Sequence, residues 1–466
     1  QSSEGWQNRH FMNTFLMEPL TWNPYPYYDS EGKPRSYRGG GRDQWNWIQD
    51  NIKKSAERNR AFGTAIVEYK FGTHLKFRST TGLSMANTEE LFTIDWGGVY
   101  TVKEASEATW NTVFRRDVEP TNLLLYNNKF GDFKLDAIFG MDAVSYYQRN
   151  MFVKGGPLII PHIFMMSNMG NSYTGTSLYQ ARMFSLLGEA RLSYKDMLYY
   201  TLTGRNDWPS TLNNNYFYSS HSLGFIFSQL ISDKSILNFG KVRASYAKVG
   251  SPAQPYANNV TMTTPNTLFI YWPFKGQQSY LPSDAYPNPN MTNEEKNEIE
   301  WGVNLDFFQS RLGVEFTQYH NWSKNQIVWS PMLSETAYTG GNVNIGGITH
   351  KGIEIALTGA PVRTSNFSWD VYLTWAQDNS NVDALGPTNA PVGVGWEGAA
   401  VVGKPYPMVY GEALLHDDNG NLVKSDEGNR DDRTLYGDWI MDPTGSKPIA
   451  KIMPDWTGGL RNTFTY

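Results

Sequence analysis

Cysteine is absent from the 466-residue sequence, which excludes disulfide bonds and thiolate metal sites. A basic excess is also lacking: 40 Lys and Arg stand against 45 Asp and Glu, a net charge of −5, so no nucleic-acid partner is expected. No transmembrane helix is predicted, because the long uncharged stretch 155–180 is interrupted by Pro157, Pro161 and several glycines. Residues 1–4 are polar and no apolar segment follows, so we expect a processed chain or a piece of a longer protein.

Aromatic residues are abundant instead. The chain holds 24 Phe, 16 Trp and 28 Tyr, together 15% of its residues, beside 42 Gly and 24 Pro. Hydrophobic residues nevertheless reach only 40%, and the mean hydropathy is −0.50. A soluble enzyme of this length normally carries more Ala, Leu and Val in helices. The composition therefore indicates a turn-rich, aromatic chain without a thick aliphatic core.

Alternation of polar and apolar residues with period two dominates the sequence, which is typical of half-buried strands. The clearest hairpin is 182–207, where Leu186, Ala190 and Leu192 share one face and a tight turn is expected around Lys195 and Asp196. Alternation also predicts strands around 241–246, 300–306, 312–316, 353–358 and 369–375. Further predicted strands are 61–71, 74–86, 121–127, 132–141, 221–229 and 455–466.

We predict an all-β fold, a large antiparallel transmembrane β-barrel, from about 14 strands of about 10 residues each. The connections alternate in length, as do the short periplasmic turns and long extracellular loops of outer-membrane barrels. Short turns are predicted at 127–132, 194–197, 231–235 and 308–311, and long loops at 142–180, 207–220, 250–297, 323–349 and 379–453. A soluble β-sandwich or propeller is the alternative, but we find no repeat at a blade-like spacing.

Eight segments share sequence features with one family. They are DSEGKPRSYRGG (29–40), LSYKDMLYYTLTGRNDWPSTL (192–212), NNNYFYSSHSLGFIF (213–227), LNFGKVRASYAKVG (237–250), EIEWGVNLDFFQSRLGVEFTQYHN (298–321), NVNIGGITHKGIEIAL (342–357), VVGKPYPMVYG (401–411) and MPDWTGGLRNTFTY (453–466). In content, order and spacing these segments resemble SusC/RagA-like TonB-dependent transporters. Two departures are local: Pro209 stands where the family usually has Ser, and 290–294 replaces a Leu-x-Pro-Glu element.

The resemblance implies an outer-membrane importer of a glycan or an oligopeptide. Members of the family have a plug domain that contacts the TonB complex, a barrel of about 22 strands, and a SusD-like surface lipoprotein that delivers the nutrient. We therefore expect the chain to be the internal part of such a barrel, embedded in outer-membrane lipid, with no plug domain within it. Other surface lipoproteins are further expected partners.

Two sets of site residues follow from this hypothesis. Aromatic rings in long loops can stack on sugar or peptide faces, and alternatively pack on each other or on the lipoprotein. The predicted substrate-binding residues are Trp208, Tyr216, Tyr218, Tyr271, Trp272, Tyr280 and Trp329. The polar side chains that alternation turns towards the lumen are interpreted as a solvated charge ladder in the wall. They are Glu189, Arg191, Arg205, Lys241, Arg243, Glu300, Asp306 and Glu354.

An acidic loop is the one feature that points to a cofactor. Asp417, Asn419 and Asn421 alternate around a glycine and precede a second acidic run at 426–432, as oxygen ligands do in calcium loops. The Glu expected at the twelfth position is missing, and Asn-Gly also forms tight hairpin turns without a metal. The seven histidines show no ligand spacing, so no transition-metal site is expected.

Motifs of zinc hydrolases, nucleophile elbows and phosphate loops are not found, so we expect no enzyme activity. Three functions stay open. The first is import of a complex nutrient, and the second is a structural or adhesive barrel that recruits surface lipoproteins. The third is a secreted β-fold carbohydrate-active enzyme, which predicts a pair of carboxylates in a cleft. Glycan and peptide substrates are not distinguished.

Overall fold

The computed structural model describes residues 11–38, 41–259, 262–263, 281–336, 338–386, 389–394, 398–425 and 437–466. The main sheet contains 14 strands. Its hydrogen-bonded order is β1-β2-β3-β4-β5-β6-β7-β8-β12-β13-β14-β15-β20, and β11 joins it by pairing with β14. The order follows the chain, so the predicted all-β fold with a large antiparallel sheet is confirmed.

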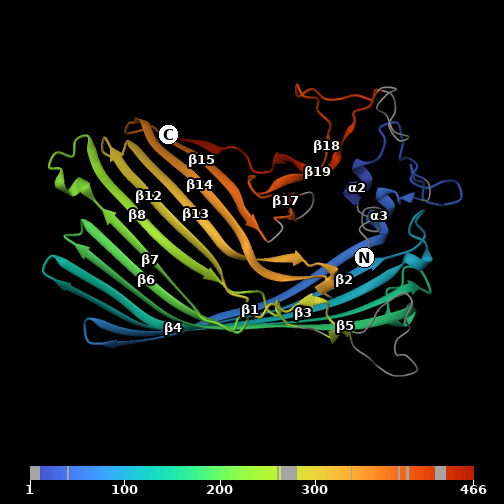
Figure 1. The fold of residues 1–466 in the computed structure, drawn as a ribbon, viewed down its shortest axis with the longest axis horizontal. Helices are drawn as coiled ribbons and strands as arrows, with labels where there is room; N and C mark the ends of the chain where they lie inside the picture. Colours follow the sequence, from blue (N-terminus) through green and yellow to red (C-terminus); the bar gives the residue numbers. More distant parts are fainter. Residues whose placement is uncertain are drawn as a thin grey trace. The chain divides into compact units, whose positions relative to one another are not determined.

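Most strands of this sheet are long. Their bounds are β1 Ile52–Phe71, β2 Leu75–Ile94, β3 Glu107–Phe130, β4 Phe133–Leu158, β5 Met169–Tyr194, β6 Leu198–Pro209, β7 Tyr216–Phe225, β8 Leu237–Ser251, β12 Glu294–Phe307, β13 Leu312–Pro331, β14 Gly340–Arg363, β15 Ser368–Leu385 and β20 Thr457–Thr465. The short β11 spans Ala285–Tyr286. In Figure 1 strands β6–β8 and β12–β15 lie side by side in chain order.

Smaller elements occupy the connections. A four-stranded sheet consists of β16 Val392–Gly393, β17 Gly398–Ala400, β18 Met408–Leu414 and β19 Met441–Lys451, and β9 Met262–Thr263 pairs with β10 Leu281–Pro282. The helices are α2 Phe11–Leu16, α3 Trp45–Asn51, η2 Lys103–Ala105, η3 Met166–Asn168, η4 Phe227–Leu230 and η5 Ser334–Thr336. Within the described ranges, no helix has the length and apolar character to cross a membrane.

The chain divides into two compact units. The first comprises Gln1–Val67, Ser79–Thr121 and Ala143–Arg182, and its described buried core is Ala108, Leu158 and Met169, with Trp96, Trp110 and Phe164 packed against it. The second comprises Glu68–Arg78, Asn122–Asp142 and Met183–Tyr466. In the second unit the buried cluster is Val382, Leu385 and Ala400.

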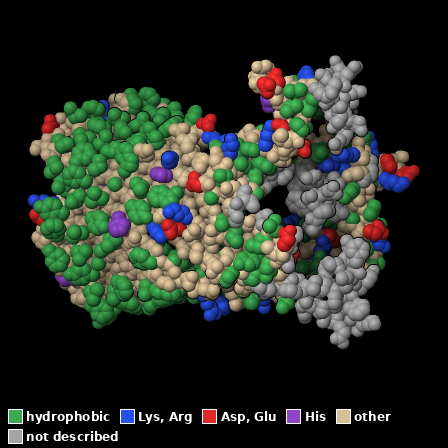
Figure 2. All heavy atoms as spheres, viewed as in Figure 1, with side chains coloured by type: hydrophobic (Ala, Val, Ile, Leu, Met, Phe, Trp, Pro, Cys, Tyr) green, Lys and Arg blue, Asp and Glu red, His purple; other side chains and the backbone are tan. Residues whose placement is uncertain are grey.

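Period-two alternation gives the strands of the second unit two unlike faces. On β12, Ile299, Trp301 and Val303 lie on an apolar face, where Trp301 stays 48% exposed. On the polar face, Glu300 lies opposite Ser245 of β8 and Tyr319 of β13. Figure 2 shows hydrophobic side chains gathered over the ends of these strands that carry the short turns. Exposed apolar rows of this kind face lipid rather than water in membrane barrels.

The predicted short turns 194–197 and 308–311 agree with the structure, whereas in 127–132 strand β3 continues to Phe130. Lys195 and Asp196 both have positive φ, 51° and 52°, which matches the right-handed strand twist in a tight hairpin. The connection at 308–311 likewise has positive φ at Phe308, Gln309 and Ser310.

Several predicted boundaries are wrong. Strands β1 to β4 are longer than the predicted 61–71, 74–86, 121–127 and 132–141: β1 and β3 begin earlier, and β2 and β4 end later. Strand β7 ends at Phe225, before η4, and not at 229. Three predicted long loops are mostly strand: residues 159–168, 210–215 and 332–339 alone connect the strands in 142–180, 207–220 and 323–349. The predicted loop 379–453 begins within β15 and contains β16–β19, while 250–297 keeps a long connection at 252–293.

The strand extensions were missed because they contain residues with low strand propensity. In β4, Gly155, Gly156 and Pro157 continue the strand, although such residues usually mark loops. A Cβ at Gly156 would overlap the backbone oxygen of Ser106, so glycine permits this close approach. The hairpin is closed by the N–H of Ile159, which donates to the carbonyl oxygen of Asn168 at 2.8 Å. Backbone pairing therefore outweighs local preference here.

Candidate functional site

The polar face of β8 and β12–β15 carries a set of charged side chains around one recess. A recess of about 310 Å³ is lined by Lys296, Glu298, Glu300, Tyr319, Asn321, His350, Glu354 and Asp378. Asp378 accepts hydrogen bonds from the Tyr319 hydroxyl at 3.1 Å and lies 2.9 Å from Nδ1 of His350. Lys296 lies 3.6 Å from Glu298. The lining of the recess is therefore polar, charged and mostly acidic.

The segment after β15 folds against this polar face and is fixed by backbone hydrogen bonds. Val382 N–H donates to the Lys404 carbonyl at 2.9 Å, and Gly403 N–H donates to the Val382 carbonyl at 2.8 Å. The Ser380 hydroxyl donates to the Tyr406 carbonyl at 3.0 Å and accepts from the Tyr406 N–H at 2.9 Å. Val382 and Leu385 are buried beneath Val392, Val394, Val402 and Tyr406. We call the described residues 385–386, 389–394 and 398–406 the inner segment.

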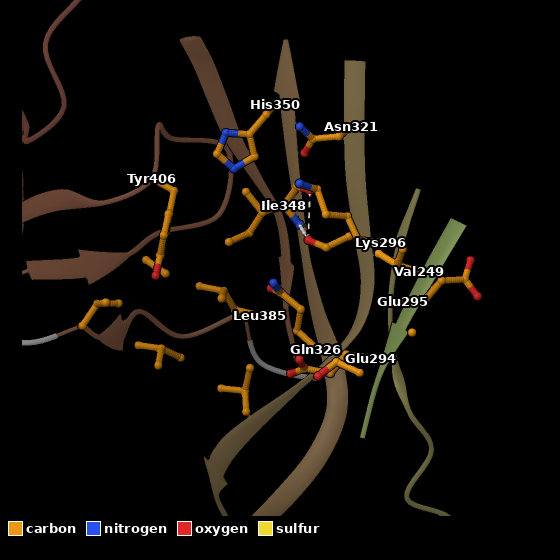
Figure 3. A pocket seen from close by; sticks show the side chains of 17 residues that line it. Val249, Glu294, Glu295, Lys296, Asn321, Gln326, Ile348, His350, Leu385 and Tyr406 are labelled. Atoms are coloured by element: carbon orange, nitrogen blue, oxygen red, sulfur yellow. Dashed lines mark hydrogen bonds between the residues drawn. The ribbon is translucent and has the colours of Figure 1, made fainter. Parts of the chain in front are cut away.

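A larger cavity of about 590 Å³ lies between the inner segment and the polar face. Its aliphatic wall consists of Val249, Val328, Ile348, Leu385, Val392, Val394 and Ala400. Its polar wall includes Glu294, Lys296, Asn321, Gln326 and His350. Figure 3 shows Tyr406 and Leu385 across from the strands that carry Asn321 and Lys296, and shows Glu295 pointing away from the cavity.

The cavity combines two kinds of chemistry. Aliphatic side chains offer favourable burial to apolar groups of a ligand. Charges of both signs approach it from the strands, because Lys296 and Glu294 belong to the same face of β12. Glu294 is fixed by the N–H of Ile327, which donates to its Oε1 at 2.8 Å. Tyr406 is the one aromatic side chain among the 17 lining residues.

The structure places the eight predicted wall residues on the polar face by register. Arg205 is the most connected of them: it donates to Asp207 at 2.7 Å, to Asp142 at 2.8 Å and to the Ser185 hydroxyl at 2.8 Å. Arg243 bonds Glu300 and donates to the Thr317 hydroxyl at 2.6 Å. Glu189 pairs with Arg191 at 3.3 Å. The pairs Glu189–Arg191 and Arg205–Asp207 each lie within one strand, whereas the contacts of Arg205 with Asp142 and Ser185 and those of Arg243 join different strands. The interpretation as a charge ladder and a role in binding both stay predictions.

Among the described residues, the predicted aromatic side chains Trp208, Tyr216, Tyr218 and Trp329 do not gather at one site. Tyr271, Trp272 and Tyr280 lie outside the described residues. Tyr216 is buried, and its ring stacks on that of Tyr218 with the centroids 6.0 Å apart. Tyr218 donates its hydroxyl to Asp207 at 2.7 Å and so joins the wall network of Arg205. Trp329 is exposed on β13.

Trp208 needs a correction. Strand alternation puts it opposite Phe184, with the two rings 5.7 Å apart, on the apolar face rather than the face of Asp207. It therefore leaves the candidate substrate-binding set.

Sequence reasoning missed the cavity. The inner segment contributes Leu385, Val392, Val394, Ala400 and Tyr406, of which Tyr406 alone is aromatic and none is charged. The one available signal is an aliphatic series, Val382, Leu385, Val392 and Val394, within the predicted loop 379–453.

The calcium candidates form a turn. Asp417 Oδ1 accepts the N–H groups of Asn419 at 2.9 Å and Asn421 at 2.8 Å, and these bonds, first that of Asn421, lower the pKa of Asp417. In the part of the chain that the structure describes, no group of three or more His, Asp or Glu has metal-binding geometry. Residues 426–436, with the second acidic run, lie outside that part. Calcium binding thus stays a prediction.

Comparison with known proteins identifies the family to which the chain is related. The family model described as "TonB dependent receptor-like, beta-barrel" matches residues 5–463. Two receptors of Formosa agariphila are similar, each 24% identical: TonB-dependent receptor P26 over 95% of this chain and 47% of the relative, and TonB-dependent receptor P3 over 85% and 42%. The chain thus spans about half the length of these relatives.

Solved structures show the same fold. The RagAB peptide transporter matches with a TM-score of 0.77 at 15% identity, over 96% of this chain and 50% of that one. The "open-open" state of the RagAB peptide importer matches with a TM-score of 0.75 at 16% identity, over 96% and 49%. The exposed apolar rows of the sheet accordingly lie against outer-membrane lipid. The chain belongs to the family of TonB-dependent receptor β-barrels of the outer membrane.

Proposed function

We propose that this chain forms the barrel portion of a TonB-driven importer whose cargo is an oligopeptide, bound in the cavity between the inner segment and the polar face. The cavity lining carries this proposal. Seven aliphatic residues and one aromatic residue line it, together with Glu294, Lys296 and His350. Peptides present apolar side chains and charged termini, which match this lining. Sugars are bound chiefly on aromatic faces, of which the cavity offers one.

The fold of this chain is similar to that of the RagAB peptide transporter, and this likeness supports a peptide as the cargo. A surface lipoprotein as delivery partner is supported by exposed apolar side chains in and beside the four-stranded sheet β16–β19, which we call the loop sheet. Met441 and Ile449 of β19 are 54% and 50% exposed, and Trp439, two residues before β19, is 46% exposed. Exposed apolar surface outside the membrane is typical of protein interfaces. The plug that contacts TonB would belong to the part of the protein beyond this sequence.

The test uses the full-length transporter in detergent, titrated with a peptide mixture and with oligosaccharides, with bound species identified by mass spectrometry. We expect peptides to bind and oligosaccharides not to bind. Val394→Asp places a charge in the aliphatic wall and should weaken peptide binding about tenfold or more. Val102→Asp, at an exposed valine, is the matched control. Preferential binding of oligosaccharides would replace the peptide proposal with the glycan one.

An uptake assay in cells distinguishes an importer from a structural or adhesive barrel and from an enzyme. Cells should import a labelled peptide only when TonB is functional, and the peptide should be recovered with its mass unchanged. Binding without TonB-dependent uptake would favour the structural or adhesive barrel. Shortened products would favour an enzyme.

A further inference from the structure

A second recess lies on the apolar face, at the level where that face turns polar. With increasing distance from the short turns, the rows of residues paired across the strands change from apolar to polar. Val303, Phe316 and Ile355 form an apolar row, while Ile299, His320 and Lys351 form a mixed row two steps higher. The next row contains Asn297, Trp322 and Thr349. Such a change, with Trp and Tyr near it, marks the membrane–water boundary of a barrel.

Irregular pairing creates the recess. The register shifts between Ser323 and Gln326 on β13 and between Gly347 and Ile348 on β14, and Asn325 has a positive φ of 55°. The resulting hollow has a volume of about 670 Å³. It is lined by Ile299, His320, Trp322, Lys324, Asn344, Ile345, Thr349 and Asp383, together with backbone of Gly346 and Gly347.

The charged side chains around the recess differ in whether they have a close hydrogen-bond or ion-pair partner. Asp383 accepts hydrogen bonds from the Thr349 hydroxyl at 2.6 Å and from Asn381 at 2.8 Å. Glu295 is paired with Lys248 at 2.5 Å. Lys324 is exposed and lies opposite Glu295 of β12, although no ion pair within 4.0 Å joins the two; Lys351 is exposed and, among the residues described, forms no salt bridge within 4.0 Å. His320 lies opposite Lys351, and its ring is 5.3 Å from that of Trp322.

We propose that this recess binds an outer-leaflet lipid whose headgroup carries phosphate. Lys324 and Lys351, with His320, supply donors for phosphate oxygens, and Trp322 and Ile345 receive the apolar part of the headgroup. His320 and Lys324 are four residues apart on β13, about 13 Å, which suits a headgroup with two separated phosphates. The acyl chains of the lipid then run along the apolar face of β12, past Ile299 and Trp301, into the bilayer. Basic side chains beside apolar surface at this depth are a general means of holding anionic lipids.

The experiment measures lipid binding to the full-length transporter in detergent by native mass spectrometry. The probes are a diphosphorylated acylated disaccharide lipid, the same lipid without phosphate, and inorganic phosphate as competitor. The variant is Lys324→Gln/Lys351→Gln. The matched control is Lys195→Gln/Lys234→Gln, which removes two exposed lysines from the short-turn end. Trp322→Ala tests the apolar part of the recess separately.

We expect the phosphorylated lipid to bind wild type and control equally, and the Lys324/Lys351 variant about tenfold or more weakly. Trp322→Ala should weaken both lipids. Three results would each overturn the proposal: equal binding of the lipid without phosphate, the same loss in the control pair, or full displacement of the lipid by inorganic phosphate. These readouts are independent of cargo, so the peptide proposal can fail without affecting them.

Discussion

The ring of Tyr319 lies over Gly352, the residue opposite it on β14. Asp378 is opposite Gly352 on β15, and the Tyr319 hydroxyl reaches it at 3.1 Å. Arg243 of β8 likewise lies beside Gly302 of β12 and donates to Thr317 of β13. A glycine in the intervening strand thus lets a long polar side chain join strands that are not neighbours. These cross-links join polar side chains of one face across three strands.

Gly352→Ala should destabilise the barrel by about 1–3 kcal/mol, because the added Cβ overlaps the Tyr319 ring and forces it away from Asp378. Denaturant unfolding of the full-length protein in detergent or lipid measures this. Gly63→Ala is the control, since a Cβ there meets nothing within 4 Å. Equal stability of the two variants would contradict the cross-strand interpretation.

Arg243→Gln should cost about 1–3 kcal/mol, because it removes the hydrogen bonds to Glu300 and Thr317 and leaves Glu300 without its cation. The double variant Arg243→Gln/Glu300→Gln should recover part of this loss, which a double-mutant cycle would quantify. Arg191→Gln, which breaks the more exposed pair with Glu189, should cost less than about 1 kcal/mol. A purely additive cycle would show that Arg243 and Glu300 do not interact.

The connection 159–168 is held by Asp95, which is buried at the end of β2. Its carboxylate accepts the N–H of His162 at 3.1 Å and that of Trp96 at 2.9 Å, and it lies 2.5 Å from Nδ1 of His162. Asp95→Ala should therefore open this connection, by about 1–3 kcal/mol for each buried bond lost. Hydrogen exchange of residues 159–168 measures the opening. His162→Ala keeps the backbone bond, so it should have the smaller effect.

The hairpin at 416–422 should lose order in acid. The N–H groups of Asn421 and Asn419 donate to the Asp417 carboxylate and lower its pKa below the ordinary value of about 4. A lowered pKa means that this stabilisation is complete above the ordinary value and disappears as the pH falls through the lowered one. Amide exchange at Asn419 and Asn421, followed from pH 6 downward, tests this. Asp417→Asn should remove the pH dependence; its persistence would assign it to another group.

Asp442 provides a second acid-sensitive contact in the loop sheet. The hydrogen bond from Lys447, followed by those from Thr444, lowers its pKa. The contact should likewise persist to a lower pH than an isolated aspartate would allow, and weaken on further acidification. Asp442→Asn should abolish that dependence in the same exchange measurement, with Asp438→Asn as the control.

The sequence by itself determined the fold class and the two faces of each strand, since these depend on neighbours in the chain. Alternation assigned Arg243, Glu300 and Glu354 to one face, and the turn at Lys195 and Asp196 follows from local backbone preference. The tertiary structure alone decided how far the strands run: Gly155–Pro157 continues β4 because the adjoining backbone pairs with it, against local propensity. It alone also made the cavity, whose wall residue Val249 and loop residue Val394 are far apart in sequence. A cavity depends on which distant segments pack together when the chain folds, and a local sequence pattern does not predict that packing.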